Sequence, residues 1–217
     1  MPVISNHDFS SVTGTARLPA IARLLMKLLK VDAFNQVMLE AGDLEGIAFT
    51  KFTLNYLGIS LEINEDELAH IPESGAFITV ANHPYGAIES LALLNLLVSK
   101  RADTLFMGNF LLKRVPNLAK YIIAVNPFEK VKDGSSISGL KTTLTKLKQG
   151  APVAIFPAGE VSAFDLKSRS VTDRKWHPVV GKLIAKAQVP VLPVYFYGDK
   201  LPCYQPSFLT KRAKHYG

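Results

Sequence analysis

Short apolar runs alternate along most of the chain with segments in which apolar residues recur at helical spacing. The apolar runs, each bounded by turn-forming residues, predict strands at 59–63, 76–81, 103–107, 121–125, 152–156 and 190–196. The periodic segments predict helices at 43–57, 87–100, 109–120, 135–149 and 174–188. Strands that are buried on both faces and joined by helices are typical of parallel sheets. The pattern therefore predicts an α/β fold with a largely parallel central sheet flanked by helices.

The N-terminal segment at 17–30 has a different, strongly amphipathic helical pattern. Its apolar stripe consists of Leu18, Ile21, Leu24, Leu25, Leu28 and Leu29, and Arg23, Lys27 and Lys30 fall on the opposite side. Two interpretations stay open: a helix that lies in a lipid interface, and a surface helix packed on the core with a solvated basic face. We divide the chain accordingly into an N-terminal helical segment at 1–57, which associates with a membrane on the first interpretation, and an α/β domain at 58–217.

The composition limits the classes of partner. The 217 residues carry a net charge of +7, from 25 Lys and Arg against 18 Asp and Glu, which favours an anionic partner: nucleic acid, an anionic lipid surface or a phosphorylated substrate. The single Cys203 excludes an internal disulfide. Residues 1–16 do not resemble a signal peptide, and no run reaches the roughly 18 apolar residues that span a bilayer. Any membrane contact is therefore expected to be peripheral.

Several candidate chemistries find no support in the sequence. The histidines are scattered, at His7, His70, His83, His177 and His215, so we expect no metal site. The chain has no nucleophile elbow, P-loop or dinucleotide fingerprint, and no nucleic-acid recognition motif.

A basic loop and a group of aromatic residues are further candidates for contacts with a partner or a substrate. The basic loop with Arg169, Arg174 and Lys175 is either a solvated surface or a contact for a lipid phosphate or an acidic carrier protein. Trp176 and the aromatic residues at 195–197 are expected in the core or in a pocket wall.

One polar segment carries candidate catalytic residues. His83 follows the predicted strand at 76–81, Pro84 and Gly86 indicate a sharp turn, and Glu89 lies at the start of the next helix. A carboxylate beside one ring nitrogen fixes the imidazole tautomer and stabilises the imidazolium, which makes a general base worth about 10²–10⁴-fold in rate. The plainer interpretation is a packed loop histidine with Glu89 as a favourable charge near a helix N-terminus, and the residue types alone favour it.

Four segments in order resemble those of glycerolipid acyltransferases, a family that includes 1-acylglycerol-3-phosphate acyltransferases. The first, Asn-His-Pro-x-Gly at 82–86, has five residues between His83 and Glu89, as in the haemolysin-like branch that includes acyltransferases of ornithine and related lipids. The other three lie at 109–128, 150–162 and 176–198, so the resemblance covers roughly residues 58–198.

The resemblance implies an O-acyltransferase with His83 and Glu89 as catalytic residues, peripheral at the cytoplasmic face of the membrane. His83 would deprotonate the hydroxyl of a lysophospholipid or lyso-aminolipid, and the oxygen would attack an acyl carrier protein or coenzyme A thioester. No metal or bound cofactor is implied, and backbone N–H groups would stabilise the oxyanion. The residues expected to bind the substrates are Asn82, Gly86, Arg114, Lys130, Pro157, Gly159 and Glu160.

The departures from the family pattern raise alternatives. Glu89 stands where Asp is usual, so we expect Glu89→Asp to raise the rate of a working base, whereas two inactive forms would indicate a lipid-binding protein without catalysis. Phe128 replaces a phosphate-binding Arg, with Lys130 and Arg114 nearby, which makes a lyso-aminolipid more plausible. In the third segment the carboxylate is shifted to Glu160. Family members usually continue beyond Gly217, so we expect a fragment or a short form. A nucleic-acid-binding module is the third hypothesis.

Overall fold

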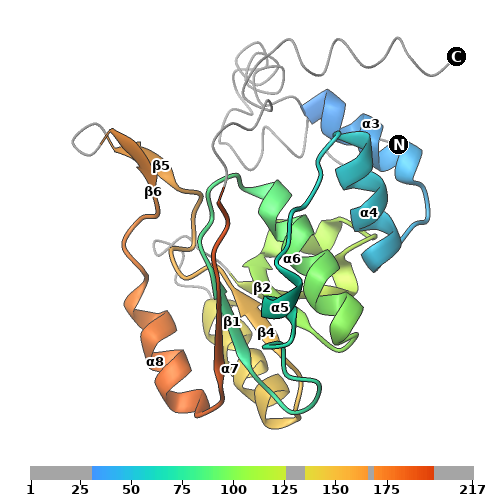
Figure 1. Cartoon of the computed structure of the whole chain (residues 1–217). Coiled ribbons are helices and arrows are strands. Elements are labelled where there is room, and N and C mark those ends of the chain that lie inside the picture. Colours follow the sequence, from blue (N-terminus) through green and yellow to red (C-terminus); the bar gives the residue numbers. More distant parts are fainter. Residues whose placement is uncertain (1–30, 126–134, 166–168, 198–217) are drawn as a thin grey trace, which may run out of the picture. The chain divides into compact units, whose positions relative to one another are not determined.

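The structure is a computed structural model that describes residues 31–125, 135–165 and 169–197 (Figure 1). Its described residues belong to two compact units, one containing residues 31–44 and the other residues 45–197. In the first unit α3 spans Val31–Ala41 and ends at Gly42, whose φ of +52° suits glycine. The amphipathic segment at 17–30 lies outside the described residues, and the division of the chain at residue 58 stays a prediction.

A five-stranded sheet in the order β3-β2-β4-β1-β7 forms the centre of the second unit, and all its pairings are parallel. The strand bounds are β1 Ile78–Ala81, β2 Leu105–Asn109, β3 Ile122–Val125, β4 Val153–Ile155 and β7 Val191–Val194. Every residue of β1 and β4 is buried, which explains why these strands appear in the sequence as apolar runs, with Thr79 the one polar residue. The predicted fold class is confirmed.

Helices cover both faces of this sheet. Going from β3 to β4 through α7 (Ser135–Lys148), and from β4 to β7 through α8 (Pro178–Ala187), the chain moves across the sheet in one direction. Going from β1 to β2 through α6 (Ala87–Lys100), it moves in the other direction. Because such crossovers are right-handed, α6 lies on the face opposite to α7 and α8. On its own face α6 packs against α4 (Gly46–Tyr56).

One apolar core lies between the sheet and the face of α7 and α8. Its buried members are Ile78, Val80, Ile123, Leu147, Val153, Ile155, Val180 and Leu183. Phe77, which directly precedes β1, and Thr79 within it alternate with these positions and are fully buried as well. Both faces of the central strands are therefore shielded from water, which keeps the strand ends in fixed positions.

Two predicted elements are wrong. The segment at 59–63 is not a strand but an irregular stretch in which Leu61 and Ile63 are exposed, and it leads into the short α5 (Glu65–Leu68). The segment at 109–120 is not one α-helix but two 3-10 turns, η1 (Phe110–Arg114) and η2 (Ala119–Tyr121). Pro116 explains the interruption, because it lacks an N–H and disfavours helical geometry at the preceding residue.

Helices α3 and α5 and one hairpin were not predicted. A two-stranded antiparallel hairpin, β5 (Ala163–Asp165) with β6 (Ser170–Thr172), stands apart from the main sheet between β4 and α8 (Figure 1). After it, α8 begins at Pro178, later than the predicted residue 174, with His177 as its N-cap. Within the described ranges, no helix has the length and apolar character needed to cross a bilayer.

Candidate functional site

His83 and Glu89 meet at the carboxyl end of β1. Nδ1 of His83 lies 2.7 Å from Oε1 of Glu89, and the two side chains are 16% and 1% exposed. The distance is that of an ion pair once the ring is protonated, although the Nδ1–H lacks the alignment of a regular hydrogen bond. The sequence predicted this pair, and the structure brings its members together at a sheet edge where α/β proteins form their sites.

The turn between the two residues holds the Glu89 carboxylate in place. The backbone N–H groups of Tyr85 and Gly86 donate to Oε1 of Glu89 at 3.0 Å and 2.8 Å. These donors precede the first turn of α6, so the carboxylate satisfies N–H groups at a helix start in the manner of a capping box. Gly86 has φ +81° and ψ −101°, a conformation that side chains disfavour. The predicted role of Gly86 in substrate binding is untested, and its evident role is to shape this turn.

The aromatic ring of Phe156 packs on the imidazole of His83. Their centroids are 4.2 Å apart and their planes differ by 23°, a stacked arrangement. Phe156 follows β4 directly, and β4 pairs with β1, so the two neighbouring strand ends present the two rings to one another. The ring plane of His83 is thus fixed by packing as well as by the carboxylate.

Two residues that the sequence analysis missed hold the backbone of His83. The N–H of His83 donates to Oδ1 of Asp173 at 3.1 Å, and its carbonyl accepts from the N–H of Ser162 at 2.8 Å. The hydroxyl of Ser162 donates to the same oxygen of Asp173. Ser162 directly precedes the hairpin β5–β6 and Asp173 directly follows it, so the hairpin brings the two residues together. Their hydrogen bonds to His83 could not be predicted because the hairpin was not predicted.

Asn82 connects two strands. Its side-chain Nδ2 donates to the carbonyl of Phe196 at 3.0 Å, and its Oδ1 accepts from the N–H of Phe196 at 2.7 Å. Both polar ends of the amide are therefore engaged with the segment that follows β7, which fixes the carboxyl ends of β1 and β7 together. The predicted contact of Asn82 with substrate stays a prediction.

The loop after β4 supplies the next three predicted residues. The carbonyl of Pro157 accepts from the N–H of His177 at 3.0 Å, and the N–H of Gly159 donates to Phe156 at 2.9 Å. Glu160 is 64% exposed, and its Oε1 lies 3.9 Å from Nε of Arg174. The loop borders the site through Phe156, whereas Glu160 faces solvent in a pair that contributes little to stability.

Of the two predicted cations, only Arg114 lies within the described residues. Arg114 ends η1, which follows β2, and β4 separates β2 from β1 in the sheet. At the usual spacing of neighbouring strands, β1 and β2 are about 10 Å apart. Lys130 lies outside the described residues. A role for Arg114 or Lys130 in holding a phosphate stays a prediction.

One hollow in the described part of the chain lies away from His83. A hollow of about 650 Å³ is lined by Glu65, Leu68, Ala69, Ile71, Pro72, Glu73 and Lys100, at the amino end of β1 and the carboxyl end of α6. That is the sheet edge opposite to His83. In the ranges 31–125, 135–165 and 169–197, no three His, Cys, Asp or Glu side chains form a group suited to a metal ion.

The arrangement around His83 suits proton transfer. Nδ1 faces the carboxylate, which favours the tautomer with the proton on Nδ1 and leaves Nε2 as the acceptor. A carboxylate in that position also stabilises the charge that forms when Nε2 takes a proton. The ring position is thus fixed by Phe156 and Glu89, and such an arrangement is chemically able to take up a proton at Nε2.

Comparison with known proteins gave two findings. A family model described as acyltransferase matches residues 10–212. The chain is also similar to a lyso-glycine lipid O-acyltransferase of Bacteroides thetaiotaomicron, with 24% identity over 181 residues. The match covers 82% of this chain and 63% of that relative, so the chain spans less than two thirds of the length of the curated protein.

Proposed function

The chain belongs to the acyltransferase family, and from this premise we propose that it transfers a fatty acyl group from a thioester to the hydroxyl of a lyso-aminolipid. The substrate class is supported by the relative, whose name specifies a lyso-glycine lipid as the acceptor. It is also supported by Phe128, which stands where a phosphate-binding Arg is usual in the wider family. The donor is an acyl carrier protein or coenzyme A thioester.

The observation that carries the proposal is the 2.7 Å contact between Nδ1 of His83 and Oε1 of Glu89. Acyl transfer to an alcohol needs a group that removes the hydroxyl proton as the oxygen attacks, and an oriented imidazole is the usual group for this task at neutral pH. Glu89 is 1% exposed, so its charge acts on the ring without much screening by water.

The proposed reaction has two steps. Nε2 of His83 takes the proton of the acceptor hydroxyl while that oxygen forms a bond to the thioester carbonyl carbon, which gives a tetrahedral oxyanion. The oxyanion then collapses, the carbon–sulfur bond breaks, and the thiolate takes the proton from the imidazolium. The products are an ester and a free thiol, and His83 returns to its starting state.

Three backbone groups near His83 do not qualify as oxyanion donors. The N–H groups of Tyr85 and Gly86 are engaged with Glu89, and the N–H of Gly159 is engaged with Phe156. The family resemblance implies that backbone N–H groups hold the oxyanion. If it is, the donors are other groups at the carboxyl edge of the sheet, where the start of α6 provides a favourable dipole.

The geometry favours this proposal over a lipid-binding protein without catalysis. That alternative was motivated by Glu89 in place of Asp, and the longer side chain does reach the imidazole here. No observation in the described residues favours the nucleic-acid hypothesis. The location at the cytoplasmic face of a membrane stays a prediction.

A transfer assay tests the proposed function. The purified protein is given a radiolabelled palmitoyl thioester, on acyl carrier protein or on coenzyme A, with either lyso-glycine lipid or lysophosphatidic acid. We expect labelled ester on lyso-glycine lipid and much less on lysophosphatidic acid. Binding of the lyso-lipid without transfer from either thioester would instead support the non-catalytic alternative.

Asp173 is a positioning residue for His83, and Asp173→Ala is expected to lower kcat about tenfold with little change in KM. The loss of its bond to the His83 N–H lets the loop shift by a fraction of an ångström, and a shift of about 1 Å can cost about 10²-fold. Asp173→Asn retains an acceptor oxygen and should recover most of the rate. Steady-state kinetics of the two variants check this; equal losses in both, or a change confined to KM, would contradict the positioning role.

A further inference from the structure

A mixed apolar and basic surface lies on the segment that runs from β6 into α8. We call it the 171–182 surface, and its members are Val171, Arg174, Lys175, Trp176, Val179 and Lys182. Val171, Trp176 and Val179 are 57%, 50% and 36% exposed. Trp176 was expected in the core or a pocket wall. A place in the core is wrong, as it is for Tyr195 and Tyr197, and a place in a pocket wall stays a prediction. Large apolar side chains that gather on a surface next to cations usually mark a contact site.

This surface is attached to the candidate active site. Asp173, which follows β6 and is three residues before Trp176, accepts from the backbone of His83. His177, immediately after Trp176, donates its N–H to Pro157 in the loop that also bears Phe156. The 171–182 surface and His83 are therefore joined by direct hydrogen bonds, and whatever binds this surface is held near the carboxyl edge of the sheet.

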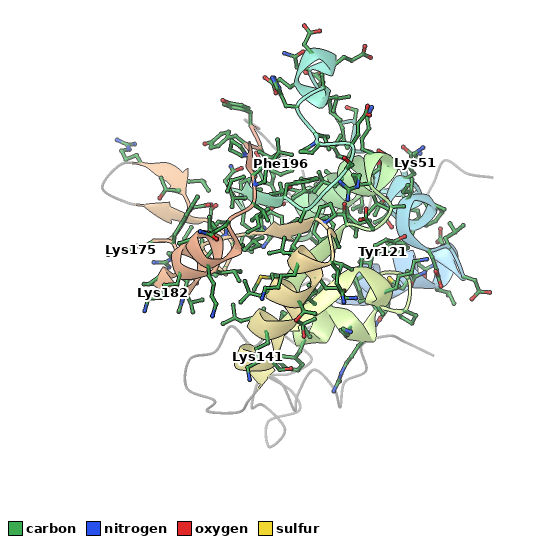
Figure 2. The ribbon with its side chains drawn as sticks, turned by 90° about the horizontal axis from the view of Figure 1, so that it is seen from below. Lys51, Tyr121, Lys141, Lys175, Lys182 and Phe196 are labelled. Atoms are coloured by element: carbon green, nitrogen blue, oxygen red, sulfur yellow. The ribbon has the colours of Figure 1, made fainter. Side chains whose placement is uncertain are left out.

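The start of α8 extends the same surface. Val180 and Leu183 face the core, whereas Val179 and Lys182, three residues apart, share the exposed side of the helix. Figure 2 shows Lys175 and Lys182 on the same side of the molecule, with Lys51 of α4 on the opposite side and Lys141 of α7 below. Lys175 and Lys182 therefore lie on one side, with Trp176 next to Lys175 in the sequence and Val179 on the same side of α8 as Lys182.

The charge of this segment is positive. Arg174, Lys175 and Lys182 are exposed, while Asp173 is engaged with His83 and Ser162. Glu160 approaches Arg174 only to 3.9 Å, and both side chains are more than half exposed, so water screens the pair. The surface therefore favours an anionic partner.

We propose that the 171–182 surface docks the protein on a membrane leaflet that contains anionic lipids, with Val171 and Trp176 in the interface and the cations at the lipid phosphates. Trp is favoured at the headgroup level because its ring is apolar and its N–H is polar, and basic residues near an anionic leaflet are attracted to it. An acidic protein would match the charge, but the exposed Val171 and Trp176 favour a lipid interface.

The inference rests on the proposed function, because the acceptor in that reaction is a lipid that must reach His83 from a membrane. Its test is independent of acyl transfer. Trp176 is the only tryptophan in the chain, so its fluorescence reports directly on this surface. We expect the emission of the full chain to shift to shorter wavelength with vesicles of equal parts phosphatidylglycerol and phosphatidylcholine. We also expect brominated lipids to quench it.

A charge variant with a matched control completes the test. Lys175→Gln with Lys182→Gln should weaken partition into the anionic vesicles by roughly 25-fold, from about fivefold per cation. Lys51→Gln with Lys141→Gln removes the same charge from exposed sites on α4 and α7 and should weaken partition much less. Co-sedimentation measures both variants, and His83→Ala should bind vesicles as the unmodified chain does, whether or not acyl transfer occurs.

Three results would overturn the docking proposal. The first is a Trp176 emission that neither shifts nor is quenched when the protein binds vesicles. The second is an equal loss of vesicle binding in both double variants. The third is a Lys175 and Lys182 variant that keeps vesicle binding and loses binding to an acidic acyl carrier protein. The last result would assign this surface to a protein partner.

Discussion

His83→Ala is expected to lower the rate of acyl transfer by about 10²–10⁴-fold, the usual contribution of a positioned general base. Alanine leaves no group that can take the proton of the acceptor hydroxyl, so the attacking oxygen would have to lose it to water. The measurement is transfer of a radiolabelled acyl group to lyso-glycine lipid, with kcat determined at a saturating concentration of each substrate.

The control for this variant is the folded state. The side chain of His83 is 16% exposed and packs on Phe156, so its loss leaves a small gap next to the ring and should cost little stability. Circular dichroism and the melting temperature should stay close to those of the unmodified protein. Full activity in a folded His83→Ala protein would exclude His83 as the base.

Glu89→Gln is expected to reduce kcat by about 10²-fold or more. The amide has nearly the shape of the carboxylate and its oxygen can still accept from Tyr85 and Gly86, but it lacks the charge that stabilises the imidazolium. The two backbone bonds change from charged to neutral ones, which costs about 1–3 kcal/mol of folding free energy. We therefore expect a lower melting temperature as well, and kcat should be compared at a temperature where both proteins are folded.

Glu89→Asp shortens the side chain and keeps its charge, so it tests the position of the carboxylate alone. From the distances in the structure we expect the opposite of what the sequence suggested. The family usually has Asp, which suggested that Asp would improve a working base. Oε1 of Glu89 already lies 2.7 Å from Nδ1 of His83 and within 3.0 Å of two backbone N–H groups. A side chain shorter by one methylene would draw the carboxylate away from all three, so we expect a loss of about 10²-fold. A rate above that of the unmodified protein would show that Glu89 is misplaced for catalysis.

The parts of the fold that the sequence predicted are those with strong local signals. The segment at 76–81 is apolar except for Thr79 because β1 is buried on both faces, and α6 begins and ends at the predicted residues 87 and 100. The wrong strand at 59–63 has the same alternation of apolar and polar residues as an exposed extended segment. The pattern does not say whether a partner strand is present. Periodicity alone therefore cannot distinguish a strand in a sheet from an extended segment without a partner strand.

The sequence predicted the contact between His83 and Glu89 but not the contacts of the site with distant parts of the chain. His83 and Glu89 are joined by a short turn, so their meeting follows from residues that are close in the sequence. Asp173 and His83 are 90 positions apart, and their hydrogen bond depends on a hairpin whose three-residue strands carry no apolar run. Asn82 and Phe196 meet for the same reason, because the order of the strands places β7 beside β1.

A double-mutant cycle on His83 and Glu89 is the most direct test of the central claim, which is that the carboxylate acts through the imidazole. The kcat of acyl transfer is measured for the unmodified protein, His83→Ala, Glu89→Gln and the double variant, each confirmed to be folded. The account predicts that the double variant is no slower than His83→Ala, because the carboxylate has no base left to support. A double variant slowed by the product of the two single losses would contradict the account, since Glu89 would then contribute without His83.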